Sequence, residues 1–335
     1  MRNETLRTGA VGAALLACLV AGPADAADKK TIGMVFKVLN NAFTPPLQQG
    51  CAQAAKDFNV DCIFVGPTEY NEAQEAQMVQ DMIQRGVDGL AVSAANPKAM
   101  ARMLKQAKDK GIPVVMFDSD VLPEDAGVRL TFIGTDNYQF GSELAKKVIE
   151  TKKSGGTVCI QSGAAASLNL NDRVQGIRDT LAGAPKDKPV QRLTGQNGWT
   201  EPNGCPVYDN DDIRLAAQQV ADVLTANPKL DAFIAVGGWA QYAPQAYKQA
   251  IDLQKARADS KDLVISFGDN FAPQMPLLKA GYSHFNIGQR PYEMAYTAVK
   301  SLVDVFNGKT IPPSIVTGVE ICTPDTADTC GKAGK

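Results

Sequence analysis

The feature that most constrains the fold is a repeated alternation between short apolar segments and longer amphipathic segments. Residues 31–36 form an apolar run, and residues 44–58 mix apolar and polar side chains at helical spacing. Pro45 and Pro46 suit the first turn of that helix, where the missing N–H group of proline costs nothing. This order predicts a parallel sheet covered by helices on both faces. Further strands are expected at 62–65, 89–92 and 113–117, with helices at 72–85 and 97–110.

The same alternation begins again after an expected strand at 130–134. A long polar loop spans 194–210, and the remaining segments repeat the strand and helix order. The chain of 335 residues is long enough for two domains. The sequence therefore predicts an α/β fold with two halves of similar plan. The later strands are expected at 157–161, 190–193, 232–236, 263–267, 284–287 and 314–317, and the later helices at 138–151, 173–181, 211–227, 241–253, 272–280 and 292–306.

Residues 1–26 have the features of a targeting segment. Arg2 and Arg7 give a positively charged start, and an apolar run over 9–22 is too short to span a bilayer comfortably. Residues 24–26, Ala-Asp-Ala, fit a small-x-small cleavage site. We therefore expect a cleaved signal peptide and an exported, periplasmic mature protein.

Composition excludes several classes of function. The formal net charge is −2, so the chain has no basic field for nucleic acid. His284 is the single histidine, which rules out a multi-histidine metal site. Neither a Gly-rich phosphate loop nor a Gly-x-Ser-x-Gly motif is present. We predict no catalytic residue, no metal and no cofactor.

Six cysteines remain after the expected leader, and an oxidising compartment favours pairing between some of them. Cys322 and Cys330 lie close together in a polar tail, so we expect a disulfide there that clamps the C-terminus. A bond between Cys159 and Cys205 is left open. The remaining two, at positions 51 and 62, fit buried thiols, because free cysteine packs as a small apolar group.

Polar and aromatic side chains gather where the expected strands end. Ligands of open α/β sheets bind at the carboxyl ends of strands. Carboxylates accept hydrogen bonds from hydroxyl groups, guanidinium and amide groups donate them, and aromatic rings offer apolar walls. The pattern predicts a site for a polyhydroxylated ligand with these candidates: Lys37, Asn41, Phe43, Asp118, Ser119, Asp120, Asn171, Arg173, Trp239, Asp269 and Gln289.

The main candidates also have ordinary structural interpretations. Asp118 fits a loop carboxylate or a helix cap. Phe43 and Trp239 fit core or hinge packing. Asn171 is most simply a helix N-cap, and Asn169 is expected to point to solvent because its neighbours pack inward.

Six motifs together resemble the periplasmic ribose-binding protein family, the pentose- and hexose-binding subunits of ABC importers. The likeness covers residues 31–317. It is carried by Leu39-Asn40-Asn41-x-Phe43, the apolar strand into Asp118, Gly134-Thr135-Asp136-Asn137, Arg173-x-x-Gly176-Ile177, Phe267-Gly268-Asp269 and Ile287-Gly288-Gln289-Arg290-Pro291.

The resemblance implies two Rossmann-like lobes joined by a three-strand hinge, which close on the ligand like a jaw. It places the N-terminal lobe at 27–134 plus 290–312 and the C-terminal lobe at 135–289 plus 313–335, with crossings near 134–135, 289–290 and 312–313. It implies a sugar or polyol ligand and a membrane permease as partner. The family's sugar contacts fall on Lys37, Asn41, Phe43, Asp118, Asn171, Asp269 and Gln289.

The chain departs from the ribose binders at several of these positions. Ser119 and Asn171 stand where the family carries arginines, and Thr44 stands where it carries a second aromatic ring. Gly237 replaces a contacting asparagine, and Asp269 is displaced by one position. These losses argue against ribose itself as the ligand.

Three other residues are expected to compensate, namely Lys37, Trp239 and Asp120. The triplet at 118–120, Asp-Ser-Asp, is similar to that of the branch that binds the autoinducer-2 type of furanosyl signal. A polyol, an unusual pentose or a branched sugar fits equally well.

The leading hypothesis is a binding protein without chemistry of its own. An exported glycosidase that uses Asp118 and Asp269 as its carboxylate pair is the weaker alternative. A repressor of the same fold is disfavoured, because a signal peptide stands where a DNA-binding helix-turn-helix would precede the first lobe. A chemoreceptor as an additional partner stays open.

Overall fold

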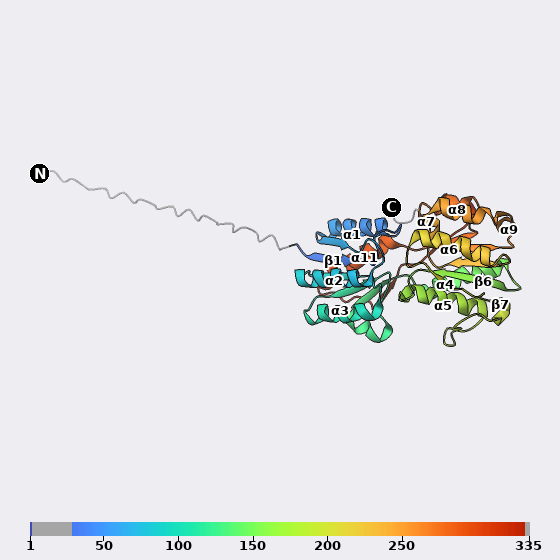
Figure 1. Cartoon of the computed structure of the whole chain (residues 1–335). Coiled ribbons are helices and arrows are strands. Elements are labelled where there is room, and N and C mark those ends of the chain that lie inside the picture. The colour runs from blue at the N-terminus through green and yellow to red at the C-terminus, as the bar shows by residue number, and fades with distance from the viewer. Residues whose placement is uncertain (2–28, 332–335) are drawn as a thin grey trace.

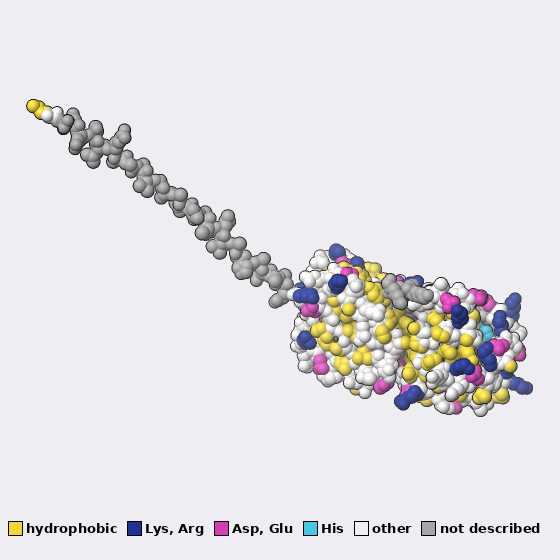
Figure 2. Space-filling view, turned by 90° about the horizontal axis from the view of Figure 1, so that it is seen from above, with side chains coloured by type: hydrophobic (Ala, Val, Ile, Leu, Met, Phe, Trp, Pro, Cys, Tyr) yellow, Lys and Arg dark blue, Asp and Glu magenta, His cyan; other side chains and the backbone are white. Residues whose placement is uncertain are grey.

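The computed structural model describes Met1 and residues 29–331, which form two α/β lobes lying side by side (Figure 1). Apart from Met1, the expected signal peptide at 1–26 lies outside the described residues. No helix in the described part of the chain has the length and apolarity needed to cross a membrane. Positive and negative side chains are interspersed over the face shown in Figure 2.

The N-terminal lobe is built on a six-stranded sheet with the order β12-β5-β4-β3-β1-β2, and all its pairings are parallel. Residues of the central strands are buried, as expected for a sheet covered on both faces. The strands are β1 (Thr31–Val35), β2 (Asp61–Val65), β3 (Gly89–Val92), β4 (Val114–Phe117), β5 (Thr131–Gly134) and β12 (Ser314–Val316). The helices are α1 (Thr44–Phe58), α2 (Glu72–Arg85), α3 (Pro97–Asp109) and α11 (Pro291–Phe306).

Local signals position the helices of this lobe. The Asn71 side chain accepts a hydrogen bond from the backbone of Gln74 at the start of α2, and Asn96 does the same for α3. Gly86 ends α2 in the left-handed conformation, with φ of 75°. These caps agree with the sequence prediction.

The C-terminal lobe contains a seven-stranded sheet with the order β13-β11-β10-β9-β6-β7, in which β8 also pairs with β6. β13 pairs antiparallel with β11, and the other pairings are parallel. The strands are β6 (Gly156–Ser162), β7 (Trp199–Thr200), β8 (Val207–Tyr208), β9 (Ala232–Ala235), β10 (Val264–Gly268), β11 (Phe285–Gly288) and β13 (Glu320–Cys322). The helices are α4 (Asn137–Thr151), α5 (Leu168–Ala182), α6 (Ile213–Ala226), α7 (Trp239–Tyr242), α8 (Pro244–Asp252), α9 (Lys255–Asp259) and α10 (Met275–Lys279).

The chain crosses between the lobes three times, between β5 and α4, between β11 and α11, and between β12 and β13. The third crossing was predicted near 312–313 and is wrong. Residues 314–316 pair with β5 of the first lobe, so the crossing falls at 317–319. The Thr135 hydroxyl donates to Gln289 Oε1 at 3.0 Å, which ties the first two crossings together.

The strand predicted at 190–193 is absent. Side-chain carboxylates satisfy part of this backbone, because Val190 N donates to Asp179 at 2.7 Å and Leu193 N donates to Glu201 at 3.2 Å. The loop predicted at 194–210 instead contributes the two short edge strands β7 and β8.

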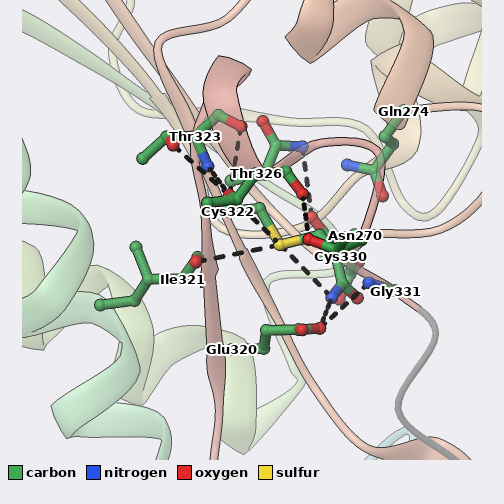
Figure 3. Close-up of a disulfide and its surroundings, with 12 residues drawn as sticks. Asn270, Gln274, Glu320, Ile321, Cys322, Thr323, Thr326, Cys330 and Gly331 are labelled. Atoms are coloured by element: carbon green, nitrogen blue, oxygen red, sulfur yellow. Dashed lines mark hydrogen bonds between the residues drawn. A yellow bond between two sulfur atoms is a disulfide. The ribbon is translucent and has the colours of Figure 1, made fainter.

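All six cysteines of the described residues are paired. The predicted Cys322–Cys330 bond is confirmed, and the open Cys159–Cys205 pairing is also formed. The third disulfide joins residues 51 and 62, so their assignment as buried thiols is wrong. Figure 3 shows the C-terminal disulfide beside Glu320 and Asn270. The described residues contain one group of potential metal ligands, which consists of Glu320 and these two sulfurs. The sulfurs are bonded to each other in the disulfide.

Candidate functional site

The N-terminal lobe presents a buried ion pair at the carboxyl ends of β1 and β4. Lys37 Nζ lies 3.1 Å from Asp118 Oδ2, and both side chains are nearly inaccessible. Ser93, which follows β3, donates to the same carboxylate oxygen at 2.8 Å. Asp118 has φ of 58°, a left-handed conformation that aspartate adopts more readily than most residues. The carboxylate is therefore fixed in position by partners from its own lobe.

The C-terminal lobe presents a buried arginine held in several directions. Arg173 on α5 is 2% exposed, and its guanidinium donates to Asn137 Oδ1 at 2.8 Å, to Val236 O at 2.9 Å and to Gln289 Oε1 at 2.6 Å. It also lies 4.3 Å from the ring centroid of Phe140. Burial lowers the pKa of Arg173, which Asp269 and Asp118 counteract. The guanidinium is thus a cation held in a fixed position beside the first two crossings between the lobes.

Asp269 follows β10 and completes the network. It accepts from Gln289 Nε2 at 2.9 Å, from the Gly238 backbone at 3.0 Å and from the Tyr242 hydroxyl at 2.8 Å. Its φ of 67° repeats the left-handed geometry of Asp118 in the other lobe. Burial and Asp269 together raise the pKa of Tyr242 well above its usual value, so the phenol stays a donor.

Asn169 joins the two lobes. Its amide donates to Asp118 Oδ1 at 3.4 Å, and Lys37 Nζ donates to its carbonyl oxygen at 3.4 Å. A second contact runs from the Ser167 hydroxyl to Ala95 O at 3.5 Å. These contacts hold the lobes together in a closed arrangement.

Aromatic side chains line the same seam. Phe43 stacks on Phe36 with centroids 5.9 Å apart and meets Phe271 of the other lobe edge-on at 5.7 Å. Trp239 is 5% exposed, and Gly237 makes room for it, since a Cβ atom there would lie 2.5 Å from the indole. The seam therefore combines apolar walls with the polar groups described above.

Asp211 is a further carboxylate at this seam. It is 4% exposed, and its Oδ2 atom has no hydrogen-bond partner among the described residues. Charged groups of both lobes interact with it electrostatically, among them Lys37, Asp118 and Asp269. Burial raises the pKa of Asp211 to about 6, although Lys37 and a hydrogen bond with Trp239 lower it.

The structure brings together most of the predicted candidates. Those that meet at the seam are Lys37, Phe43, Asp118, Arg173, Trp239, Asp269 and Gln289. Asn41 lies at its rim, where it accepts from the backbone of Phe43 at 2.9 Å and lines a pocket of about 390 Å³. Ser119 is fully buried, and its hydroxyl has no partner among the described residues.

Two predicted candidates lie apart from the cluster. Asn171 is exposed and donates to Ala165 O at 2.9 Å. Asp120 forms an ion pair with Arg129, with its oxygens 2.5 and 2.8 Å from the guanidinium nitrogens. The carboxylate of Asp120 is therefore already neutralised by Arg129. This does not support the interpretation of the Asp-Ser-Asp triplet at 118–120 as a sign of a ligand of the autoinducer-2 type.

Sequence reasoning missed several members of the cluster. Asn169 was expected to face solvent, but it is 3% exposed and bridges the lobes. The alternation of polar and apolar residues there continues into α5, and helical geometry turns position 169 inward and position 171 outward. Ser93, which follows a predicted strand, was within reach of the strand-end rule, whereas Asp211 and Tyr242 lie beyond a loop and inside a helix.

The fold and this seam define a class, a two-lobed binding protein that encloses a small polar ligand between its lobes. The sequence model of the family described as periplasmic binding protein domain matches residues 32–310. The chain belongs to this family.

Individual sugar-binding proteins and a solved structure are also similar to this chain. The chain is 23% identical over 298 residues to the ribose import binding protein RbsB of Bacillus subtilis, covering 88% of each. It is 25% identical over 288 residues to the D-allose-binding periplasmic protein of Escherichia coli, covering 83% of this chain and 86% of that one. A solute binding protein of an ABC transporter from Burkholderia graminis, solved with D-arabinose, superposes with a TM-score of 0.77 at 28% identity, over 90% and 98% of the chains.

These relatives are binding proteins rather than enzymes, so the prediction that the chain is not an enzyme is confirmed. The predicted fold and the resemblance to the sugar-binding subunits of importers are confirmed as well.

Proposed function

We propose that this protein binds a sugar or polyol between its lobes in the periplasm and delivers it to the membrane permease of an ABC importer. The single observation that carries the proposal is the hydrogen bond of Asp118 in one lobe with Asn169 on α5 of the other, the helix whose Arg173 is linked to Asp269 through Gln289. The relatives whose names mention ribose and D-allose support the class of ligand.

The chemistry of the seam suits hydroxyl groups. Asp118 and Asp269 are acceptors already fixed by protein donors, so little conformational entropy is lost when a hydroxyl group binds them. Lys37 and Arg173 supply charge-assisted donors for ring or hydroxyl oxygens. Phe43 and Trp239 offer apolar surfaces for the C–H faces of a sugar ring.

Closure would couple binding to delivery. The lobes are joined by three short crossings, which suits a hinge motion in which a few residues absorb the change. A ligand that contacts both lobes stabilises the closed state relative to the open one. The permease would then distinguish loaded from empty protein by the closed surface.

Isothermal titration calorimetry against neutral and amino-substituted sugars and polyols tests the proposal, with a furanosyl signal of the autoinducer-2 type included. We expect one ligand per chain and a loss of at least tenfold in affinity for Asp118→Asn. Asp120→Asn, two residues away but paired with Arg129, is the matched control and should bind normally. Absence of binding by every member of the panel would refute the proposal.

A further inference from the structure

The carboxylate of Asp211 is the feature of this seam that a neutral ligand leaves unexplained. Asp211 is the last loop residue before the N-cap of α6, and its φ of 61° is left-handed. Its backbone N–H donates to Asp209 Oδ1 at 2.9 Å, which fixes the turn. The side chain is 4% exposed, and Oδ2 has no partner among the described residues. Leaving a buried acceptor without a donor costs free energy, so we expect a bound ligand to supply the donor for Oδ2.

Asp211 lies at the strand ends of the second sheet, three residues after β8, whose last residue pairs with Ser162 at the end of β6. It interacts electrostatically with Lys37 and Asp118 of the first lobe and with Asp269 of the second. The charge of Asp211 also acts to raise the pKa values of Arg173 and Tyr242. Asp211 is therefore at the strand ends of its own lobe and within electrostatic reach of charged groups from both lobes.

The charges of the seam do not balance. Lys37 is engaged by Asp118, and Arg173 is linked to Asp269 through Gln289. Three carboxylates face two cations, so 2 − 3 leaves one negative charge. Among the described residues Asp211 is the carboxylate of the three that neither forms an ion pair nor is linked to a cation through hydrogen bonds, although Lys37 acts on it electrostatically. A sugar hydroxyl would donate one hydrogen bond without compensating this charge. A protonated amine brings both the missing charge and three donors.

We infer that the ligand carries a primary ammonium group that pairs with Asp211, which makes it an amino sugar or an amino polyol. The inference rests on the proposed function and specifies its ligand class. Trp239 beside Asp211 would pack against the carbon skeleton next to the amine.

The remaining buried acids near the seam add no positive charge. Asp209 and Glu75 both have pKa values raised by burial, so they tend to be neutral. Tyr70 interacts electrostatically with Asp211, and burial keeps its phenol protonated by raising its pKa. None of these groups is a cation, and their ionisation would only increase the negative excess.

Titration calorimetry with matched ligand pairs tests the inference on the unmodified protein. The pairs are glucosamine with glucose, galactosamine with galactose, and glucamine with sorbitol, at pH 7. We expect the best amine to bind at least tenfold more tightly than its neutral partner. Neutral members binding as tightly as their amines in every pair would overturn the inference and leave the proposed function standing. Absence of binding by all pairs and by the wider panel would overturn both.

Variants then assign the preference to one carboxylate. Asp211→Asn should raise the Kd of the amine at least tenfold more than it raises the Kd of its neutral partner. Asp212→Asn is the matched control, because Asp212 is the next residue along the chain and caps α6, a role that asparagine fills equally well. Equal losses for both ligands in Asp211→Asn would contradict the inference. The ligand comparison on the unmodified protein decides the question even if this variant does not fold.

Discussion

The bridging amide of Asn169 gives the sharpest test of lobe closure. Asn169→Ala removes two interlobe hydrogen bonds, both to charged groups and both 3.4 Å long. At this length each is worth about 0.5–1 kcal/mol, below the range of about 1.5–3 kcal/mol for well-formed bonds to charged groups. The closed state therefore loses about 1–2 kcal/mol, which corresponds to a roughly 5- to 30-fold increase in the Kd of the ligand.

The open, unliganded protein lacks these bonds, so its thermal midpoint should not change. Titration calorimetry and thermal denaturation without ligand measure the two quantities separately. Asn171→Ala is the control on the same helix, because its side chain is exposed and contacts only its own lobe. Its Kd should stay within about twofold of the wild type, the range expected for a site without ligand contact. Unchanged binding by Asn169→Ala, or equal losses in both variants, would refute the reasoning.

Three further predictions concern stability. Burial raises the pKa of Glu75 to about 8 from its ordinary 4.5, so its stabilising contribution is present at low pH and is lost as pH rises through 8. Glu75→Gln should remove about 2–4 kcal/mol of that decline in a pH series of urea denaturations, and an unchanged slope would contradict it. Glu201→Gln should destabilise the fold by about 3 kcal/mol in urea without changing sugar affinity, because Arg178 loses its buried bidentate partner. The double variant Cys322→Ser, Cys330→Ser should lower stability by up to about 2–3 kcal/mol, as closing a short loop predicts, and wild-type denaturation curves would contradict it.

The architecture was readable from the sequence because alternation at two periods identifies the strands and helices before any contact is known. Caps such as Asn96 and Gly86 act locally, so their effect does not depend on the rest of the fold. The errors fall on the edge of the second sheet and on the last crossing. At 190–193 the backbone bonds to the carboxylates of Asp179 and Glu201, and such long-range side-chain pairing leaves no periodic signal.

The site was partly predictable for a related reason. Asp118, Asp269 and Gln289 each follow a strand directly, and Lys37 lies two residues after β1. The parallel sheet brings these strand ends together whatever the loops do. Residues on helices and in long loops depend on tertiary packing. Asn169 is one example, since only the orientation of α5 decides whether Asn169 or Asn171 faces the seam.

The three buried carboxylates of the seam share an unusual backbone conformation. Asp118 and Asp269 each follow a central strand, and each has a left-handed φ, of 58° and 67°. Asp211 has the same conformation, with φ of 61°, although it follows a loop. Non-glycine residues in this region cost free energy and persist where the surrounding structure requires them, most often at functional sites. Three of the seven non-glycine residues with positive φ in the described part of the chain are acids of this seam, which supports the proposal that their carboxylates are directed at the ligand.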